Sequence, residues 1–128
     1  MSIEDLYCSI GSDYEEVFGR LPSKQLIEKF IVRFIDDKSF ELLNEAIEAG
    51  NRKDAFLHAH TLKGVAANLG FKRLLKSVSV VTELLRDESA KTADVDQRLL
   101  EQVRTDYYET VKAIKSYIKL KSRKKLFI

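Results

Sequence analysis

Apolar residues recur at helical spacing along almost the whole chain, and this periodicity constrains the fold more than any other feature of the sequence. The chain of 128 residues contains one proline and five glycines, so it has few places at which to turn. A many-stranded sheet needs frequent tight turns, whereas long helices do not. We therefore expect an all-α protein built from long amphipathic helices.

Proline, glycine and capping residues indicate where the first helices begin and end. A long helix is expected to open near Pro22 and to close before Gly50. The polar stretch 36–39 offers Asp or Ser as a new N-cap, so we expect a bend or a short break there. The next helix is predicted over residues 52–69, and it stops at Gly70.

Two further helices follow. One is predicted from residue 71 to about residue 87, and the segment 87–94 is the most loop-like part of the chain, with Thr92 as a candidate cap. The last helix is defined by an apolar stripe of six residues: Leu99, Val103, Tyr107, Val111, Ile114 and Ile118.

Four long amphipathic helices with short connections predict an antiparallel up-down four-helix bundle in a single domain covering residues 1–128. Residues 1–21 form a short N-terminal helical segment, with one or two short helices around Ile3–Cys8 and Asp13–Phe18 that pack on one end of the bundle. The bundle itself covers residues 22–118, and residues 119–128 form a basic tail.

The composition narrows the class of protein. The one cysteine, Cys8, cannot form an internal disulfide, which fits a reducing cytoplasm. The N-terminus is acidic and lacks the order of a secretory signal, and no apolar run approaches the roughly 18 residues needed to span a bilayer. We expect a stand-alone cytoplasmic domain without membrane insertion, and a monomer, since nothing in the pattern demands a partner copy.

The charge is distributed unevenly. Residues 1–50 carry eleven acidic and five basic residues, whereas residues 112–128 carry seven basic residues and no acidic one. The basic tail is interpreted first as a solvated helix end whose cations suit the C-terminal dipole. A surface for an acidic partner, a membrane or RNA is the alternative. Few aromatic residues lie among the cations, so a nucleic-acid site is poorly supported.

Both histidines of the chain, His58 and His60, lie in the predicted helix 52–69. At about 100° per residue, His60 lies about 140° and His58 about −60° from the centre of that helix's apolar stripe. His60 is therefore predicted on the solvent face. His58 flanks the core, and we expect it to be partly buried and bonded to a neighbouring helix. The stripe consists of Ala55, Ala59, Leu62, Ala66 and Leu69.

The predicted surroundings of His60 suit the transfer of a phosphoryl group. Phe56, Lys63, Gly64 and Ala67 flank it at one-turn spacings, with no competing carboxylate among them. A neutral imidazole is a competent nucleophile at cytoplasmic pH, and attack on phosphorus would form a labile N–P bond. Lys63 would attract the phosphoryl charge. Gly64 costs about 1 kcal/mol relative to alanine in a helix interior, and access to His60 explains that cost.

These residues resemble a known family. The stretch His60-Thr61-Leu62-Lys63-Gly64, continued by Val65-Ala66-Ala67-Asn68-Leu69-Gly70, resembles the H-x-L-K-G-x-x-x-x-x-G pattern of histidine-containing phosphotransfer (HPt) domains. The wider run AFLHAHTLKGVAANLGFKRLL also resembles that family, and the similarity extends over roughly residues 11–118. The chain is similar to a stand-alone, bacterial-type HPt protein.

The resemblance implies a phosphorelay carrier in two-component signalling. His60 matches the phosphoryl-accepting histidine, Lys63 the lysine that neutralises the phosphoryl group, and Gly64 the glycine that keeps the imidazole accessible. Such a carrier accepts the group from a receiver-domain aspartate or a sensor histidine kinase and passes it to another receiver (response-regulator) domain. It has no ATP site of its own and is no enzyme. It also has no intrinsic cofactor, and Mg²⁺ is expected in the partner receiver domain.

The surface around His60 is predicted to dock the partner. An apolar centre with a basic rim would suit the acidic pocket of a receiver domain. The predicted docking residues are Lys53, Phe56, Leu57, Ala67, Lys72 and Arg73.

Other functions remain as alternatives. A degenerate HPt fold could act as a non-phosphorylated helical adaptor that binds receiver or kinase domains. A di-iron bundle needs Glu-x-x-His pairs, and neither histidine is preceded by glutamate at that spacing. Two histidines on opposite sides of a helix cannot chelate one ion, so no metal site is expected. A membrane-surface role rests only on the basic tail.

Overall fold

The computed structural model describes the backbone of residues 1–126 and the side chains of residues 1–123. All regular structure in this part of the chain is helical, as the periodicity predicts. The elements are α1 (Ile3–Ser9), α2 (Tyr14–Arg20), α3 (Lys24–Phe34), α4 (Ser39–Glu48), α5 (Arg52–Leu69), α6 (Lys72–Arg86), the 3₁₀-helix η1 (Thr92–Asp94) and α7 (Gln97–Leu126).

Polar side chains cap the helices where the sequence predicts an N-terminus. Directly after Pro22, Ser23 Oγ accepts a hydrogen bond from a backbone N–H in the first turn of α3 at 3.2 Å. Asn51 Oδ1 does the same for α5 at 3.1 Å. Gly50 and Gly70 follow α4 and α5 with φ of +70° and +71°, a conformation that glycine adopts without strain.

The expected break at residues 36–39 is present, because α3 ends at Phe34 and α4 begins at Ser39. Asp37 Oδ1 accepts a hydrogen bond from the Ser39 N–H at 2.8 Å and so closes this gap. The prediction that Thr92 caps the last helix is wrong. Thr92 is buried at the start of η1, and Asp96 Oδ1 accepts the hydrogen bond, at 2.8 Å, from the first turn of α7.

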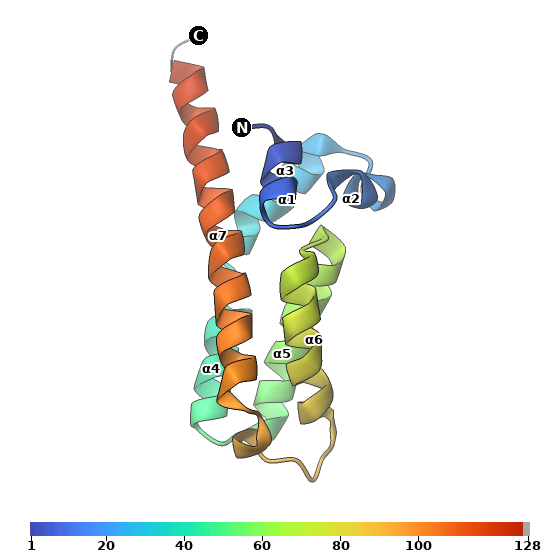
Figure 1. Ribbon diagram of the computed structural model, residues 1–128, viewed down its shortest axis with the longest axis vertical. Helices are drawn as coiled ribbons and strands as arrows, with labels where there is room; N and C mark the ends of the chain where they lie inside the picture. Colours follow the sequence, from blue (N-terminus) through green and yellow to red (C-terminus); the bar gives the residue numbers. More distant parts are fainter. Residues whose placement is uncertain (127–128) are drawn as a thin grey trace.

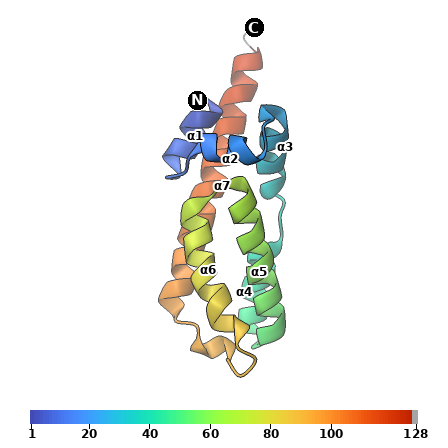
Figure 2. The ribbon, with the colours of Figure 1, turned by 90° about the vertical axis from the view of Figure 1, so that its right-hand side faces the viewer.

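Helices α4, α5, α6 and α7 lie side by side (Figures 1 and 2). Helix α5 packs against α4 on one side and α6 on the other, and α6 packs against α7. The predicted apolar stripes form the core between them. All five stripe residues of α5 are buried, and so are the four inward positions of α6: Leu74, Val78, Val81 and Leu85.

The short helices α1 and α2 cover the end of α5 and α6, as the sequence predicts (Figure 1). The buried Tyr7 hydroxyl donates a hydrogen bond to the Leu69 carbonyl at 2.8 Å. From α2, Arg20 Nη2 donates to the Ala67 carbonyl at 3.0 Å. Both donors bind carbonyl groups in the last turn of α5, so the N-terminal segment fixes the end of the helix that carries both histidines.

Helix α7 continues to Leu126, so most of the predicted basic tail prolongs this helix, while residues 127–128 lie outside the described part of the chain. It is anchored on α3, where Glu28 accepts a hydrogen bond from the Tyr117 hydroxyl at 2.9 Å and pairs with Lys121. Within residues 1–126, none of the helices combines the length and the apolar character needed to cross a membrane.

Candidate functional site

Helix α5 places His60 on the surface. Its apolar stripe is buried against α4 and α6, and His60, which lies on the opposite side of the helix, is exposed. The angle calculated for an ideal helix therefore predicts the position of this imidazole correctly.

His58 differs in part from the prediction. It is half-buried, as expected for a residue flanking the core. Within the described part of the chain, Arg52 and Thr61 of α5 donate side-chain hydrogen bonds, and the His58 imidazole takes part in none. The predicted bond to a neighbouring helix is therefore absent from the described residues, although the half-buried position of His58 agrees with the prediction.

An aromatic side chain supports the His60 ring. Phe56, one turn earlier on α5, stacks on the imidazole with ring centroids 5.8 Å apart and an interplanar angle of 23°. The guanidinium carbon of Arg86, from the last turn of α6, lies 5.1 Å from the centroid of the Phe56 ring. A guanidinium at this distance from an aromatic ring is attracted to it. Arg86, Phe56 and His60 thus form a continuous row across α6 and α5.

Lys63 forms an ion pair with a carboxylate from the neighbouring helix α6. Lys63 Nζ lies 3.6 Å from Glu83 Oε1. The same carboxylate accepts hydrogen bonds from Arg86 Nε and Nη2, each at 3.1 Å. Arg86 first, and Lys63 second, hold the pKa of the Glu83 carboxyl below its ordinary value. The expectation of a face without a competing carboxylate holds for α5 and is wrong for the assembled site.

Glu83 and Arg86 are the residues that sequence reasoning missed. They lie three positions apart in the helix predicted over residues 71–87, on the side away from its apolar stripe. The sequence could have indicated these two residues. Consecutive antiparallel helices place the last turns of α6 beside the first turns of α5, so polar residues near the end of α6 are expected to lie close to Phe56 and His60. Arg52 confirms this alignment, because its Nη1 donates to the Leu85 carbonyl at 2.6 Å.

Gly64 leaves open space one turn after His60. A Cβ built at this position would have no side chain or neighbouring helix within 4 Å. The backbone is ordinary α-helix, so neither a left-handed conformation nor a close contact requires glycine here.

The structure brings most of the predicted docking residues to the same face. Lys53, Leu57 and Ala67 are exposed on α5 around His60, and Leu57 retains 55% of its accessible surface. Phe56 is half-buried beneath them. Lys72, at the start of α6, pairs with Glu16 of α2, with 3.0 Å between Nζ and Oε2.

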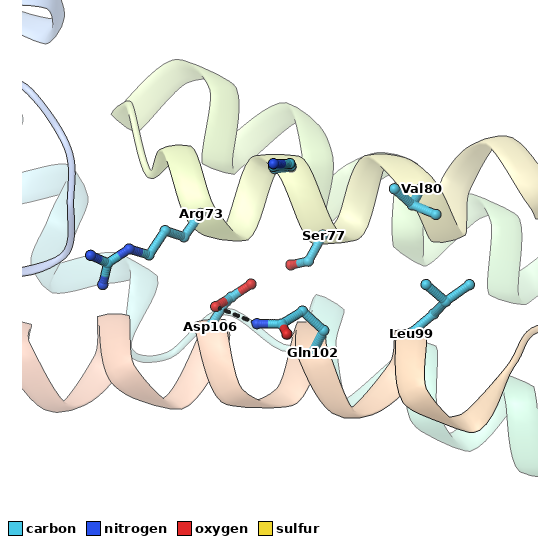
Figure 3. A pocket seen from close by; sticks show the side chains of 7 residues that line it. Arg73, Ser77, Val80, Leu99, Gln102 and Asp106 are labelled. Atoms are coloured by element: carbon cyan, nitrogen blue, oxygen red, sulfur yellow. Dashed lines mark hydrogen bonds between the residues drawn. The ribbon is translucent and has the colours of Figure 1, made fainter.

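Arg73 is the predicted docking residue that the structure does not bring to this face. It lies on the side of α6 that faces α7, where its Nη1 is 3.9 Å from Glu109 Oε2. Figure 3 shows Arg73 with Ser77 at one wall of a groove between α6 and α7, opposite Gln102 and Asp106 of α7. The groove has a volume of about 360 Å³, and His60 takes no part in its lining.

The chemistry available at His60 follows from this geometry. An exposed imidazole, supported by a stacked ring and flanked by two cations and one carboxylate, can meet a phosphoryl group held by another molecule. The described residues contain no group of three side chains able to hold a metal ion. Because His60 is exposed on α5 and Gly64 leaves the space beside it open, a reaction partner can approach the imidazole from solvent.

Comparison with known proteins agrees with these observations. A family model described as the Hpt domain matches residues 25–113. No curated protein and no solved structure matches the chain at a significant level. Hpt domains are phosphocarrier modules that interact with receiver domains and kinases in two-component signalling. Since the match covers well over half of the sequence, including α5 and α6 in full, the chain belongs to the Hpt domain family.

Proposed function

We propose that His60 accepts a phosphoryl group from a receiver-domain aspartate or a sensor histidine kinase and passes it to another receiver domain. The single observation that carries this proposal is the exposure of His60 on the one face of α5 where Gly64 leaves the approach open. Family membership supplies the class of reaction.

The proposed phosphoryl transfer requires no group of this chain other than the imidazole of His60. One ring nitrogen attacks the phosphorus of the partner's aspartyl phosphate with its lone pair. The N–P bond forms as the P–O bond breaks, and the electron pair of that bond leaves on the aspartate carboxylate. The return transfer to a second receiver reverses these bond changes. The chain acts as substrate and carrier, and the partner supplies Mg²⁺ and most of the catalytic groups.

Lys63 is proposed to neutralise the phosphoryl charge. Its ammonium lies on the same side of α5, one turn from His60, and its side chain is 32% exposed, so it can turn toward a new anion. A phosphoryl group carries a charge of about −1.5 to −2 at neutral pH and forms strong charge-assisted hydrogen bonds with cations.

The docking surface is proposed to consist of Lys53, Phe56, Leu57, Ala67 and Lys72, without Arg73. Leu57 and Phe56 supply the apolar centre, and the two lysines lie toward opposite ends of the face. An acidic receiver surface would complement this arrangement. We further propose that α4 to α7 form an antiparallel up-down four-helix bundle acting as a rigid support, and that the protein works in the cytoplasm as a monomer.

The decisive experiment uses a set of receiver domains phosphorylated with labelled phosphate. The full chain is incubated with each receiver and Mg²⁺, and we expect acid-labile, alkali-stable label on the chain. The label should be lost in His60→Gln and retained in the matched control His58→Gln. Label that survives in His60→Gln and vanishes in His58→Gln would overturn the assignment. Binding to receivers without any label would favour the adaptor function instead.

A further inference from the structure

Two cations share one carboxylate beside the His60 face. Glu83 Oε1 and Oε2 each accept a hydrogen bond from the Arg86 guanidinium at 3.1 Å, and Oε1 also lies 3.6 Å from Lys63 Nζ. Both oxygens of Glu83 are therefore engaged, and the three side chains together carry a net charge of +1. Lys63, the residue proposed to bind the phosphoryl group, already has an anionic partner while His60 is free.

A row of contacting side chains links the carboxylate of α6 to the histidine of α5. Arg86 holds Glu83 through two hydrogen bonds and lies over the Phe56 ring, and that ring stacks on the imidazole of His60. These contacts place Glu83 on the part of α6 that borders the phosphoryl-accepting face, and they restrict where its charge can go.

We propose that Glu83 is the counter-ion of the phosphoryl site, which holds Lys63 while His60 is free and raises the free energy of the phosphorylated state. The inference rests on the proposed function, and it identifies Glu83 as a residue that determines how readily phosphorylated His60 gives up its phosphoryl group. When the phosphoryl group arrives, Lys63 turns from Glu83 to the new anion, and the carboxylate stays nearby as a repelling charge. A carrier built this way releases its phosphoryl group readily to the next receiver.

The size of the effect follows from Coulomb's law. For an assumed separation of about 8 Å in a water-like dielectric, the repulsion between one carboxylate and a doubly charged phosphoryl group amounts to a factor of about 5 in an equilibrium constant. Replacing the carboxylate with a neutral amide removes this factor, and replacing it with a cation applies it a second time. The series Glu, Gln, Lys at position 83 should therefore change the equilibrium in two equal steps.

We expect the fold to tolerate this series. The Glu83 side chain is 56% exposed, and exposed ion pairs contribute little to stability. Glu109 of α7 is a matched control, because its side chain is 55% exposed and it also pairs with an arginine, Arg73, on the far side of α6 from His60.

The experiment measures phosphoryl exchange with N-phosphoimidazole, using the full chain in a His58→Gln background. One N–P bond breaks and an equivalent one forms on His60 as imidazole is released, so the equilibrium constant, read by phosphorus NMR, reports the surroundings of His60. We expect Glu83→Gln to raise this constant about 5-fold and Glu83→Lys about 25-fold, and both factors to shrink toward one in about 1 M salt, where exposed charges are screened beyond about 3 Å.

Several results would overturn the inference. An exchange constant of Glu83→Gln within twofold of the parent would show that the carboxylate does not act on the phosphoryl group. A lower constant would show that Glu83 holds Lys63 in place for the phosphoryl group. If Glu109→Gln and Glu109→Lys changed the exchange constant as much as the Glu83 variants do, the effect would come from the net charge of the protein and not from the position of Glu83. A chain that exchanges with N-phosphoimidazole but with no receiver would refute the proposed function, and the charge series would still decide the role of Glu83.

Discussion

Substituting Gly64 by alanine should make the protein more stable and a poorer phosphoryl carrier. Gly64 lies in the interior of α5 with helical backbone angles, and a Cβ there meets nothing within 4 Å. The gain is thus the full propensity difference between glycine and alanine in an exposed helix interior, about 0.8–1 kcal/mol. For a chain of 128 residues this raises the Tm by about 3 °C.

The same methyl group lies one turn from His60, on the side from which the receiver has to approach. We expect phosphoryl transfer from a receiver to slow by about 10-fold or more, because a displacement of the reacting atoms by about 1 Å can cost up to about 100-fold. Stability is measured by urea denaturation and calorimetry, and transfer by the initial rate of labelling of His60.

Gly19→Ala provides the control for this substitution. Gly19 lies in α2, and a Cβ there also has nothing within 4 Å, so alanine should raise stability without affecting transfer. A loss of stability in Gly64→Ala would mean that glycine serves the fold. A gain of stability with a transfer rate within twofold of the parent would refute the explanation that Gly64 keeps the imidazole accessible.

Three further predictions concern the end of α5 and the docking face. Gly70→Ala should lower the free energy of unfolding in urea by about 2–5 kcal/mol, because φ is +71° and the added Cβ would lie 2.3 Å from a side chain of α2. Tyr7→Phe should cost about 1–3 kcal/mol at neutral pH by leaving the buried Leu69 carbonyl unpaired. Burial raises the pKa of Tyr7 above its ordinary value of 10.0, so the hydroxyl stabilises the fold fully below pH 10 and progressively less above it. The loss of stability that urea denaturation measures for Tyr7→Phe should therefore be smaller at pH 11 than at pH 9. Lys53→Ala should raise the KM for a phosphorylated receiver, whereas Arg73→Ala should leave it unchanged, because Arg73 faces α7.

Local rules were enough to predict the helices and the orientation of the histidines. Capping side chains, glycines after helix ends and apolar stripes depend on a few neighbouring residues, so they can be read from the sequence. Thr92 shows the limit of such rules. Thr92 and Asp96 are both good caps, and the choice between them depends on the burial of Thr92 against the end of α4, which no local pattern contains.

The composition of the site depends on how neighbouring helices are rotated and aligned, and this could not be read from any one helix. Arg73 and Lys72 are adjacent in sequence, about 100° apart on α6, and they face different neighbours. Glu83 and Arg86 look like an ordinary surface pair at i and i+3 until α5 is placed beside them.

The small residues in the core of α5 explain why its neighbour reaches the His60 face. Three of its five buried stripe positions are alanines, namely Ala55, Ala59 and Ala66. The distance between packed helices depends on the side chains at their contact, and alanine permits a close approach. Long side chains from the edge of α6 then extend past the interface onto the exposed surface of α5, as Arg86 does over Phe56 and Glu83 does toward Lys63. The alanines that allow α5 to be deeply buried thus also bring the charged side chains of α6 close to the imidazole. The electrostatic potential at His60 is therefore determined by residues of both helices.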